Sequence, residues 1–135
     1  KSLLLDIKNY NNISESMIID ALKKVDFIFS PDIELKIIIN KYNEITSFIN
    51  SGFPVICEIQ HFNEYYNLLS QYPDIYGFAI KNKDITSSQV EEIKKSGKEI
   101  YLFEIRAPKS IRNALLKFST AVITDDLRAT ILEKF

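Results

Sequence analysis

Short apolar runs alternate along this chain with longer segments in which apolar residues recur every three or four positions. The short runs are rich in Ile, Val, Phe and Tyr and are bounded by residues that favour turns, so we interpret them as β-strands. The six predicted strands are Ser2–Ile7, Asp26–Ser30, Pro54–Ile59, Ile75–Ile80, Glu99–Ile105 and Ala121–Thr124.

The segments between these runs have the spacing and the end signals of helices. Ser14 is expected to cap the first helix. Pro31 is expected to open the second, which either runs to Gly52 or is divided by a kink near Asn43. The other predicted helices are Asn63–Ser70, Thr86–Ser96, one that begins at Pro108, and Leu127–Phe135.

Strands that alternate with helices predict an α/β protein with a parallel sheet and helical crossovers. Two architectures satisfy this pattern: a doubly wound open sheet, or part of a (β/α)8 barrel, whose complete form takes about 250 residues. We predict a single domain over residues 1–135, with parallel strands in sequential order that form a partial or incomplete (β/α)8 TIM-type barrel.

The composition excludes several classes of function. The net charge is −1, so no basic field attracts nucleic acid. No run approaches the roughly 20 apolar residues of a membrane span, and no signal peptide is recognisable. Because the chain enters a strand-like run at once, we expect it to be a piece of a longer protein. Cys57 is the only cysteine, which favours a buried apolar role and fits a cytoplasmic protein.

Charged residues stand at the end of almost every predicted strand, where ligands bind in both architectures. They are Asp6 and Lys8, Glu58, Lys81, Glu104 and Arg106, and Asp125. A carboxylate and an ammonium on one strand face, as at Asp6 and Lys8, suit a divalent metal and a phosphate oxygen, although a solvated strand end or a plain ion pair is the simpler interpretation of these residues taken alone. Mixed charges at one rim predict a site for an anionic, metal-bound ligand.

Several catalytic signatures are missing from the sequence. It contains no G-x-G-x-x-G, no P-loop, no G-x-S-x-G and no His or Cys cluster that suits zinc. His61, the only histidine, follows the third strand together with Gln60, and a structural role is its simpler interpretation.

The order of motifs resembles the C-terminal two thirds of the glycerophosphodiester phosphodiesterase family. The opening LLLDIK resembles that family's strand ending in Glu-x-Lys, with Asp6 in the Glu position and Lys8 matching. Val25–Leu35 resembles the next strand and its Ser-rich turn. The segment SGKEIYLFEIRAPKSIRNALLKFSTAVITDD resembles a helix, Gly, strand, short helix and closing strand of the form GIITD.

The resemblance implies a (β/α)8 barrel that hydrolyses glycerophosphodiesters of lipid metabolism with Ca²⁺ or Mg²⁺. It makes Asp6 a metal ligand and Lys8 a phosphate contact. From neighbouring strand ends we add Glu58 as a second metal ligand, and Lys81, Glu104 and Arg106 as contacts to a small phosphate-bearing substrate.

This sequence also departs from the family. The family's His-Arg-Gly, with a following Glu and a second His, is absent. Phe103 stands where the aromatic residue is often Trp, Arg106 stands where Asn is frequent, and no Gly precedes the last strand. We therefore assign no catalytic residue and expect no appreciable hydrolysis by this chain alone.

Two other interpretations stay open. One is a non-catalytic binding or interaction domain that retained a phosphate-binding rim, and the other is an unrelated open-sheet domain. Because an incomplete barrel leaves sheet edges open, we expect a homodimer, or a gap covered by the Leu127–Phe135 helix or another terminal segment.

Overall fold

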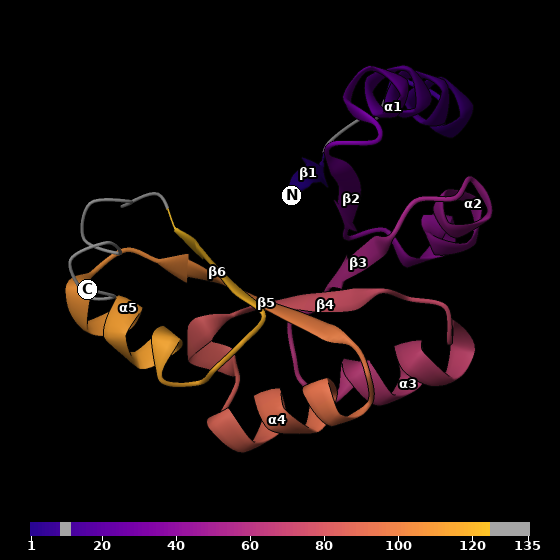
Figure 1. Ribbon diagram of the computed structural model, residues 1–135. Helices are drawn as coiled ribbons and strands as arrows, with labels where there is room; N and C mark the ends of the chain where they lie inside the picture. The colour runs from indigo at the N-terminus through magenta and orange to yellow at the C-terminus, as the bar shows by residue number, and fades with distance from the viewer. Residues whose placement is uncertain (9–11, 125–135) are drawn as a thin grey trace.

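The computed structural model describes residues 1–8 and 12–124, and its six strands form one sheet in sequential order (Figure 1). The strands are β1 (Ser2–Ile7), β2 (Glu34–Ile39), β3 (Val55–Glu58), β4 (Gly77–Lys81), β5 (Glu99–Ile105) and β6 (Ala121–Thr124). Every neighbouring pair is parallel. The order has no reversal, so the doubly wound alternative is wrong, and the prediction of a partial TIM-type barrel is confirmed.

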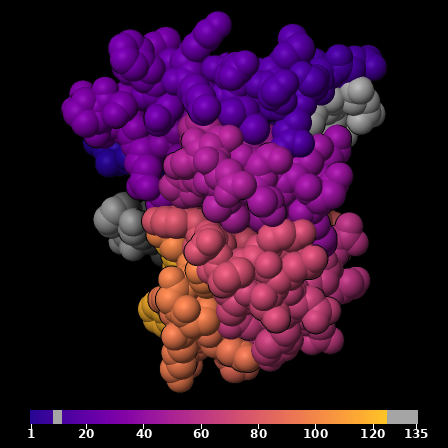
Figure 2. All heavy atoms as spheres, turned by 90° about the vertical axis from the view of Figure 1, so that its right-hand side faces the viewer, coloured from indigo at the N-terminus to yellow at the C-terminus, as the bar shows by residue number. Residues whose placement is uncertain are grey.

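The helices cover the convex side of this curled sheet. They are α1 (Glu15–Phe29), α2 (Ile45–Asn50), α3 (Glu64–Gln71), α4 (Ser87–Lys95) and α5 (Pro108–Leu115), with 3-10 turns η1 (Tyr42–Glu44) and η2 (Asn82–Asp84). Seen from that side, α1 to α4 follow one another in chain order over the surface (Figure 2). Among the described residues, no helix is long and apolar enough to cross a membrane.

Two apolar clusters lie on opposite faces of the sheet. The larger one lies between the sheet and the helices, where strand residues such as Ile37, Phe78 and Leu102 meet helix residues such as Phe48 and Val90. The smaller one lies on the concave face, around Ile38, Ile56, Ala79 and Tyr101. Alternate residues of one strand enter different clusters because strand side chains point to opposite faces. The concave face corresponds to the interior of a barrel.

A polar group of four residues lies on this concave face near the N-terminal ends of β2, β4 and β5. We call it the basal cluster, and its members are Lys36, Tyr76, Glu99 and Tyr101. The Lys36 Nζ lies 3.5 Å from Glu99 Oε2 and 4.7 Å from the centre of the Tyr76 ring. Both tyrosine hydroxyls donate hydrogen bonds to the Glu99 carboxylate.

Gly77 permits the close approach of β4 to β5, because a Cβ there would lie 2.6 Å from the Glu99 carbonyl oxygen.

The end signals of the first helix and of the predicted helix Thr86–Ser96 agree with the structure. The Ser14 hydroxyl accepts a hydrogen bond from the Met17 backbone N–H at 3.3 Å, which satisfies a free donor of the first turn of α1. Thr86 and Gln89 form a reciprocal capping box at the start of α4. Gly97 follows the end of α4 with φ +83°, a conformation that glycine adopts without strain.

Two adjacent predictions are wrong. The run Asp26–Ser30 is not a strand, because α1 continues through it to Phe29 and leaves the Phe27 side chain 85% exposed. Pro31 does not open a helix, because Glu34–Ile39 is β2. Five consecutive residues of β2 are buried and pack on both faces of the sheet, although one of them is Lys36. Its apolar residues therefore show no alternation that separates a strand from a helix.

The correction changes one detail of the family resemblance. Val25–Leu35 is the end of α1, a turn and the start of β2 rather than a strand followed by a Ser-rich turn. Neither alternative for the helix expected from Pro31 is correct, because the segment before Asn43 is the strand β2 and the helix α2 begins only after η1. The other predicted strands agree with the structure to within a few residues, while the Leu127–Phe135 helix and Asp125 lie outside the described residues.

Candidate functional site

The C-terminal ends of the parallel strands meet at one edge of the sheet, which we call the rim. In β1, β3 and β4 the last concave-facing side chains are Asp6, Glu58 and Lys81, each two positions beyond an apolar residue of the smaller cluster. The register pairs Glu58 with Ala79 across β3 and β4. Because the strands are parallel, these three residues, which the sequence predicted, all lie on the concave side of the rim.

Lys8 links the two predicted metal ligands. Its Nζ lies 3.1 Å from Asp6 Oδ2 and 3.4 Å from Glu58 Oε2. Partial burial lowers the pKa of Lys8, but the hydrogen bond to Asp6 and the charges of Glu58 and Asp6 outweigh it, so that the pKa is raised. Lys8 is therefore held as an ammonium group, with its side chain 43% exposed.

A pocket of about 180 Å³ opens beside this ion pair, and we call it the Lys8 pocket. Its lining combines the three charged groups with apolar side chains: Asp6, Lys8, Ile38, Glu58, Ala79, Phe103 and Ile123. The Glu58 Oε2 atom is buried and accepts no hydrogen bond, although the Lys8 ammonium is near it. This oxygen therefore retains capacity for a further donor or a cation.

A second pocket, of about 370 Å³, lies beside the first, and we call it the Lys81 pocket. Glu58 and Phe103 belong to both pockets, and the remaining lining residues are Ile59, Gln60, His61, Lys81 and Asp84. The Lys81 Nζ lies 3.6 Å from Glu104 Oε2, so its charge is partly compensated. Sequence reasoning placed Lys81 at the rim but missed Asp84, because η2 brings that residue to the rim after β4 has ended.

A bulge in β5 directs Glu104 toward Lys81. The pairing of β5 with β6 shifts register between Leu102 and Ile105, and Glu104 has φ +59°. In an unbroken strand Glu104 would share the helix side with Leu102, whereas here Ile105 packs into the larger cluster instead. Glu104 and Arg106 both line a shallow third pocket of about 260 Å³, which confirms that they lie together.

A partly buried group of hydrogen bonds fixes the loop after β3, and we call it the Tyr42–Glu64 latch. The Tyr42 hydroxyl lies 2.5 Å from Glu64 Oε2 and 3.0 Å from the Glu58 carbonyl oxygen. Glu64 Oε1 accepts hydrogen bonds from the backbone N–H groups of Gln60 and His61, at 3.2 and 3.0 Å. This loop carries Gln60 and His61 to the Lys81 pocket, so the latch shapes the wall of that pocket.

The pKa values of the latch agree with its geometry. Burial raises the pKa of Glu64, but the hydrogen bonds from Tyr42 and from the two backbone groups outweigh it, so that the pKa is lowered. Burial and the neighbouring Glu64 carboxylate raise the pKa of Tyr42 well above its ordinary value. At neutral pH Glu64 is therefore a carboxylate and Tyr42 its neutral donor.

The described part of the rim is not electropositive. Four carboxylates, from Asp6, Glu58, Asp84 and Glu104, face three cationic side chains, from Lys8, Lys81 and Arg106. Within residues 1–8 and 12–124 no group of three or more His, Cys, Asp or Glu residues is arranged to hold a metal ion. In this part of the chain the expected metal ligands Asp6 and Glu58 therefore do not belong to a group of three or more such residues.

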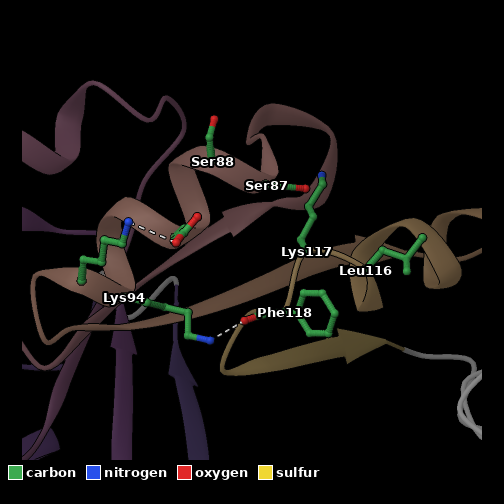
Figure 3. A pocket seen from close by; sticks show the side chains of 8 residues that line it. Ser87, Ser88, Lys94, Leu116, Lys117 and Phe118 are labelled. Carbon is green, nitrogen blue, oxygen red and sulfur yellow. Dashed lines mark hydrogen bonds and ion pairs between the residues drawn. The ribbon is translucent and has the colours of Figure 1, made fainter.

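Two other features do not belong to this site. Cys57 is buried on the helix side of β3, and burial raises its pKa to about 12, so the simpler interpretation of an inert thiol is supported. A hollow of about 740 Å³ lies on the outer surface between α4 and the turn after α5 (Figure 3). There the Lys94 Nζ donates to the Phe118 carbonyl oxygen at 2.7 Å, while Leu116 and Phe118 are exposed.

Comparison with known proteins supports the fold but gives no sequence match. No family model matches the chain, and no curated protein is significantly similar in sequence. A phosphodiesterase of Oleispira antarctica, solved in complex with the product sn-glycerol-3-phosphate, is similar in structure with a TM-score of 0.76 and 15% identity. That match covers 98% of this chain and 55% of the phosphodiesterase.

Two further solved structures are assigned as glycerophosphoryl diester phosphodiesterases. The protein from Agrobacterium tumefaciens has a TM-score of 0.71 and 13% identity, with 97% of this chain and 57% of that one covered. The protein from Silicibacter pomeroyi has a TM-score of 0.54 and 10% identity, with 86% and 55% covered. The chain spans little more than half the length of these structures, and the fold resemblance expected from its motifs is confirmed.

Proposed function

We propose that this chain forms the phosphate-binding segment of a glycerophosphodiester phosphodiesterase-type barrel. The observation that supports this most is the position of Lys8, an ammonium group held at the mouth of a rim pocket by Asp6 and Glu58. The similar structures include a phosphodiesterase solved with a phosphate-bearing product. Lys8 is then the main contact for a phosphate oxygen, while Lys81 and Arg106 add positive charge along the rim and Glu104 orients Lys81.

A divalent metal fits this proposal because the rim alone does not attract an anion. The four carboxylates outnumber the three cations, so an added divalent charge reverses the balance. Asp6 and Glu58 would hold the metal, and the Glu58 oxygen without a hydrogen bond is one available ligand atom. Two carboxylates suit Mg²⁺, which keeps several waters, better than Ca²⁺, which takes 6–8 oxygen ligands. When bound, the metal would stabilise negative charge on the phosphate.

Hydrolysis also needs a proton donor for the leaving oxygen, which typically contributes about 10²–10⁴-fold to the rate. His61 is the only imidazole in the chain, and it lines the Lys81 pocket rather than the Lys8 pocket. We therefore propose that the 135-residue chain binds but does not appreciably turn over its ligand. Incubation with glycerophosphocholine and Mg²⁺ or Ca²⁺, with release of glycerol 3-phosphate as the readout, tests this. Robust turnover that disappears in Asp6→Ala would contradict it.

Titration calorimetry tests the binding site itself. We expect glycerol 3-phosphate to bind in the presence of Mg²⁺ and to lose at least about tenfold in affinity when EDTA removes the metal, because charge-assisted contacts contribute on the order of 1.5–3 kcal/mol each. Asp6→Asn should remove most of the metal dependence. The control is Asp74→Asn, an exposed aspartate before β4 at the opposite end of the sheet. Equal affinity with and without metal would refute the metal site.

The second candidate is a non-catalytic binding domain with the same rim. It is favoured by the absence of a three-residue metal cluster in the described ranges. It predicts metal-independent phosphate binding, so the same calorimetry separates the two functions.

We also propose a cytoplasmic location, which suits the single buried thiol. We further propose a homodimer, because β1 and β6 each pair with only one strand within the described residues. Sedimentation as a monomer would refute the dimer.

A further inference from the structure

The hollow between α4 and the turn after α5, which we call the outer hollow, has an exposed apolar wall (Figure 3). Leu116 is 64% exposed and Phe118 is 72% exposed, so neither side chain is packed into the core. Phe118 has φ +54°, a left-handed conformation that is uncommon for a bulky residue. Residues held in such conformations cluster at functional sites. An aromatic residue at a position that suits glycine, facing a hollow, indicates a docking surface.

The charges of the outer hollow are cationic and incompletely compensated. Its lining carries three lysines and one carboxylate, Glu91, which pairs with Lys95 at 3.1 Å. Within residues 1–8 and 12–124, the ammonium groups of Lys94 and Lys117 donate hydrogen bonds only to uncharged oxygen atoms of backbone carbonyls and one amide side chain. In this part of the chain two positive charges therefore meet no carboxylate, and they favour a partner with negative charge.

The last residues of α1 and the turn after it form a second exposed apolar surface, which we call the α1 tip (residues 26–32). Phe27 is 85% exposed and Ile28 is 73% exposed. Asp26 and Asp32 bound this surface, and the sequence between them contains no cation. An exposed group of apolar residues marks an interaction surface, and its two carboxylates match the lysines of the outer hollow in charge.

The α1 tip and the outer hollow of one chain lie too far apart to meet. In the sheet, whose strands follow one another from β1 to β6, α1 precedes β2 and α4 follows β4. Both views place α1 and α4 at opposite ends of the row of helices (Figures 1 and 2). The two complementary surfaces can therefore meet only between two copies of the chain.

We infer that the α1 tip of one copy docks in the outer hollow of another copy, with Phe27 and Ile28 against the apolar wall and the two aspartates near the lysines. Because the contact joins two different surfaces, it is heterologous, and its repetition makes rings or chains of molecules. It involves neither the rim nor the edges of the sheet. The inference is therefore independent of phosphate binding and of a homodimer formed through β1 and β6.

Sedimentation velocity over a series of protein concentrations tests this contact with one substitution on each surface. Phe27→Ser removes an apolar side chain from the α1 tip. Phe118→Asn removes the aromatic ring from the outer hollow and tolerates the left-handed conformation. We expect each variant alone to lose at least about tenfold in the self-association constant, as for a buried interface anchor. High salt should also weaken the association of the natural chain, because it screens the charges.

An equimolar mixture of the two variants gives the decisive measurement. Phe27→Ser keeps an intact outer hollow, and Phe118→Asn keeps an intact α1 tip. The mixture should therefore recover an association that neither variant shows alone. It should stop at one such contact for each pair of molecules, because no further intact tip and hollow remain to extend the chain.

Met17→Ser is the matched control, because Met17 is 62% exposed on the same helix but lies in its first turn. This variant should associate as the natural chain does. Circular dichroism verifies that each variant folds, and Ile28→Ser replaces Phe27→Ser if that variant does not. The inference is overturned if either variant alone associates as strongly as the natural chain, or if the mixture associates no more than the separate variants.

Discussion

The two ends of the concave face contain the same chemistry and use it differently. At the N-terminal ends of the strands, the Lys36 side chain is 8% exposed and is enclosed by Glu99 and two tyrosines. At the C-terminal ends, Lys8 also meets carboxylates, but its side chain is 43% exposed beside a pocket. A lysine enclosed by all its partners contributes to structure, whereas one held on one side only is able to bind a ligand.

The electrostatics of the two lysines follow this difference in enclosure. Burial lowers the pKa of Lys36, but its contacts with Tyr76 and Glu99 outweigh it, and the pKa is raised, as it is for Lys8. Burial, together with the Glu99 carboxylate, raises the pKa of Tyr101, which keeps that hydroxyl a donor. Both lysines are therefore cations at neutral pH, and only access to solvent and to a cavity distinguishes them.

The largest expected effect is at the basal cluster. Lys36→Ala leaves Glu99 without its cation in a half-buried position, and we expect it to lower the free energy of unfolding by about 2–3 kcal/mol. Urea denaturation measures this change. Lys36→Met, which keeps the length of the side chain and removes its charge, should lose less than Lys36→Ala. A loss below about 0.5 kcal/mol in both variants would show that the basal cluster is not structural.

A smaller effect is expected at the Tyr42–Glu64 latch, between the core and the rim. Tyr42→Phe removes the hydroxyl that donates a hydrogen bond to the Glu64 carboxylate. We expect the free energy of unfolding at pH 7 to fall by about 1 kcal/mol. Because the pKa of Glu64 is lowered in the folded state, its contribution is present above its ordinary pKa and disappears as the pH falls through the folded value.

The pH dependence gives this prediction a control. The stability difference between the natural chain and Glu64→Gln should be constant above about pH 5 and should shrink as the pH falls below about 4. Thermal unfolding at a series of pH values measures it. A difference that grows toward acid pH would mean that the folded state raises the pKa of Glu64, which would contradict the latch geometry.

The smallest effect on stability is expected at Lys8. Its pairs with Asp6 and Glu58 are partly exposed, so Lys8→Ala should change the free energy of unfolding by no more than about 1 kcal/mol. The same substitution should reduce the affinity for glycerol 3-phosphate with Mg²⁺ by at least about tenfold. If Lys8→Ala destabilises the fold as strongly as Lys36→Ala does, the contrast between the two ends is wrong.

The sequence by itself determined most of the alternation of strands and helices, the cap at Ser14, the helix that begins near Thr86, and most of the charged residues at the rim. These features are local: a strand end, a cap and a two-residue period are visible in neighbouring positions. Sequential parallel order also follows, because short right-handed crossovers place consecutive strands side by side.

Tertiary structure alone decided the rest. The apolar run Asp26–Ser30 has the composition of a strand, yet only Glu34–Ile39 pairs with both β1 and β3, so burial on two faces overrode the local pattern. The bulge that directs Glu104 to Lys81, the arrival of Asp84 at the rim and the enclosure of Lys36 each depend on contacts between residues distant in the chain. The period of a strand specifies a face, but only packing specifies whether that face is closed or open to a ligand.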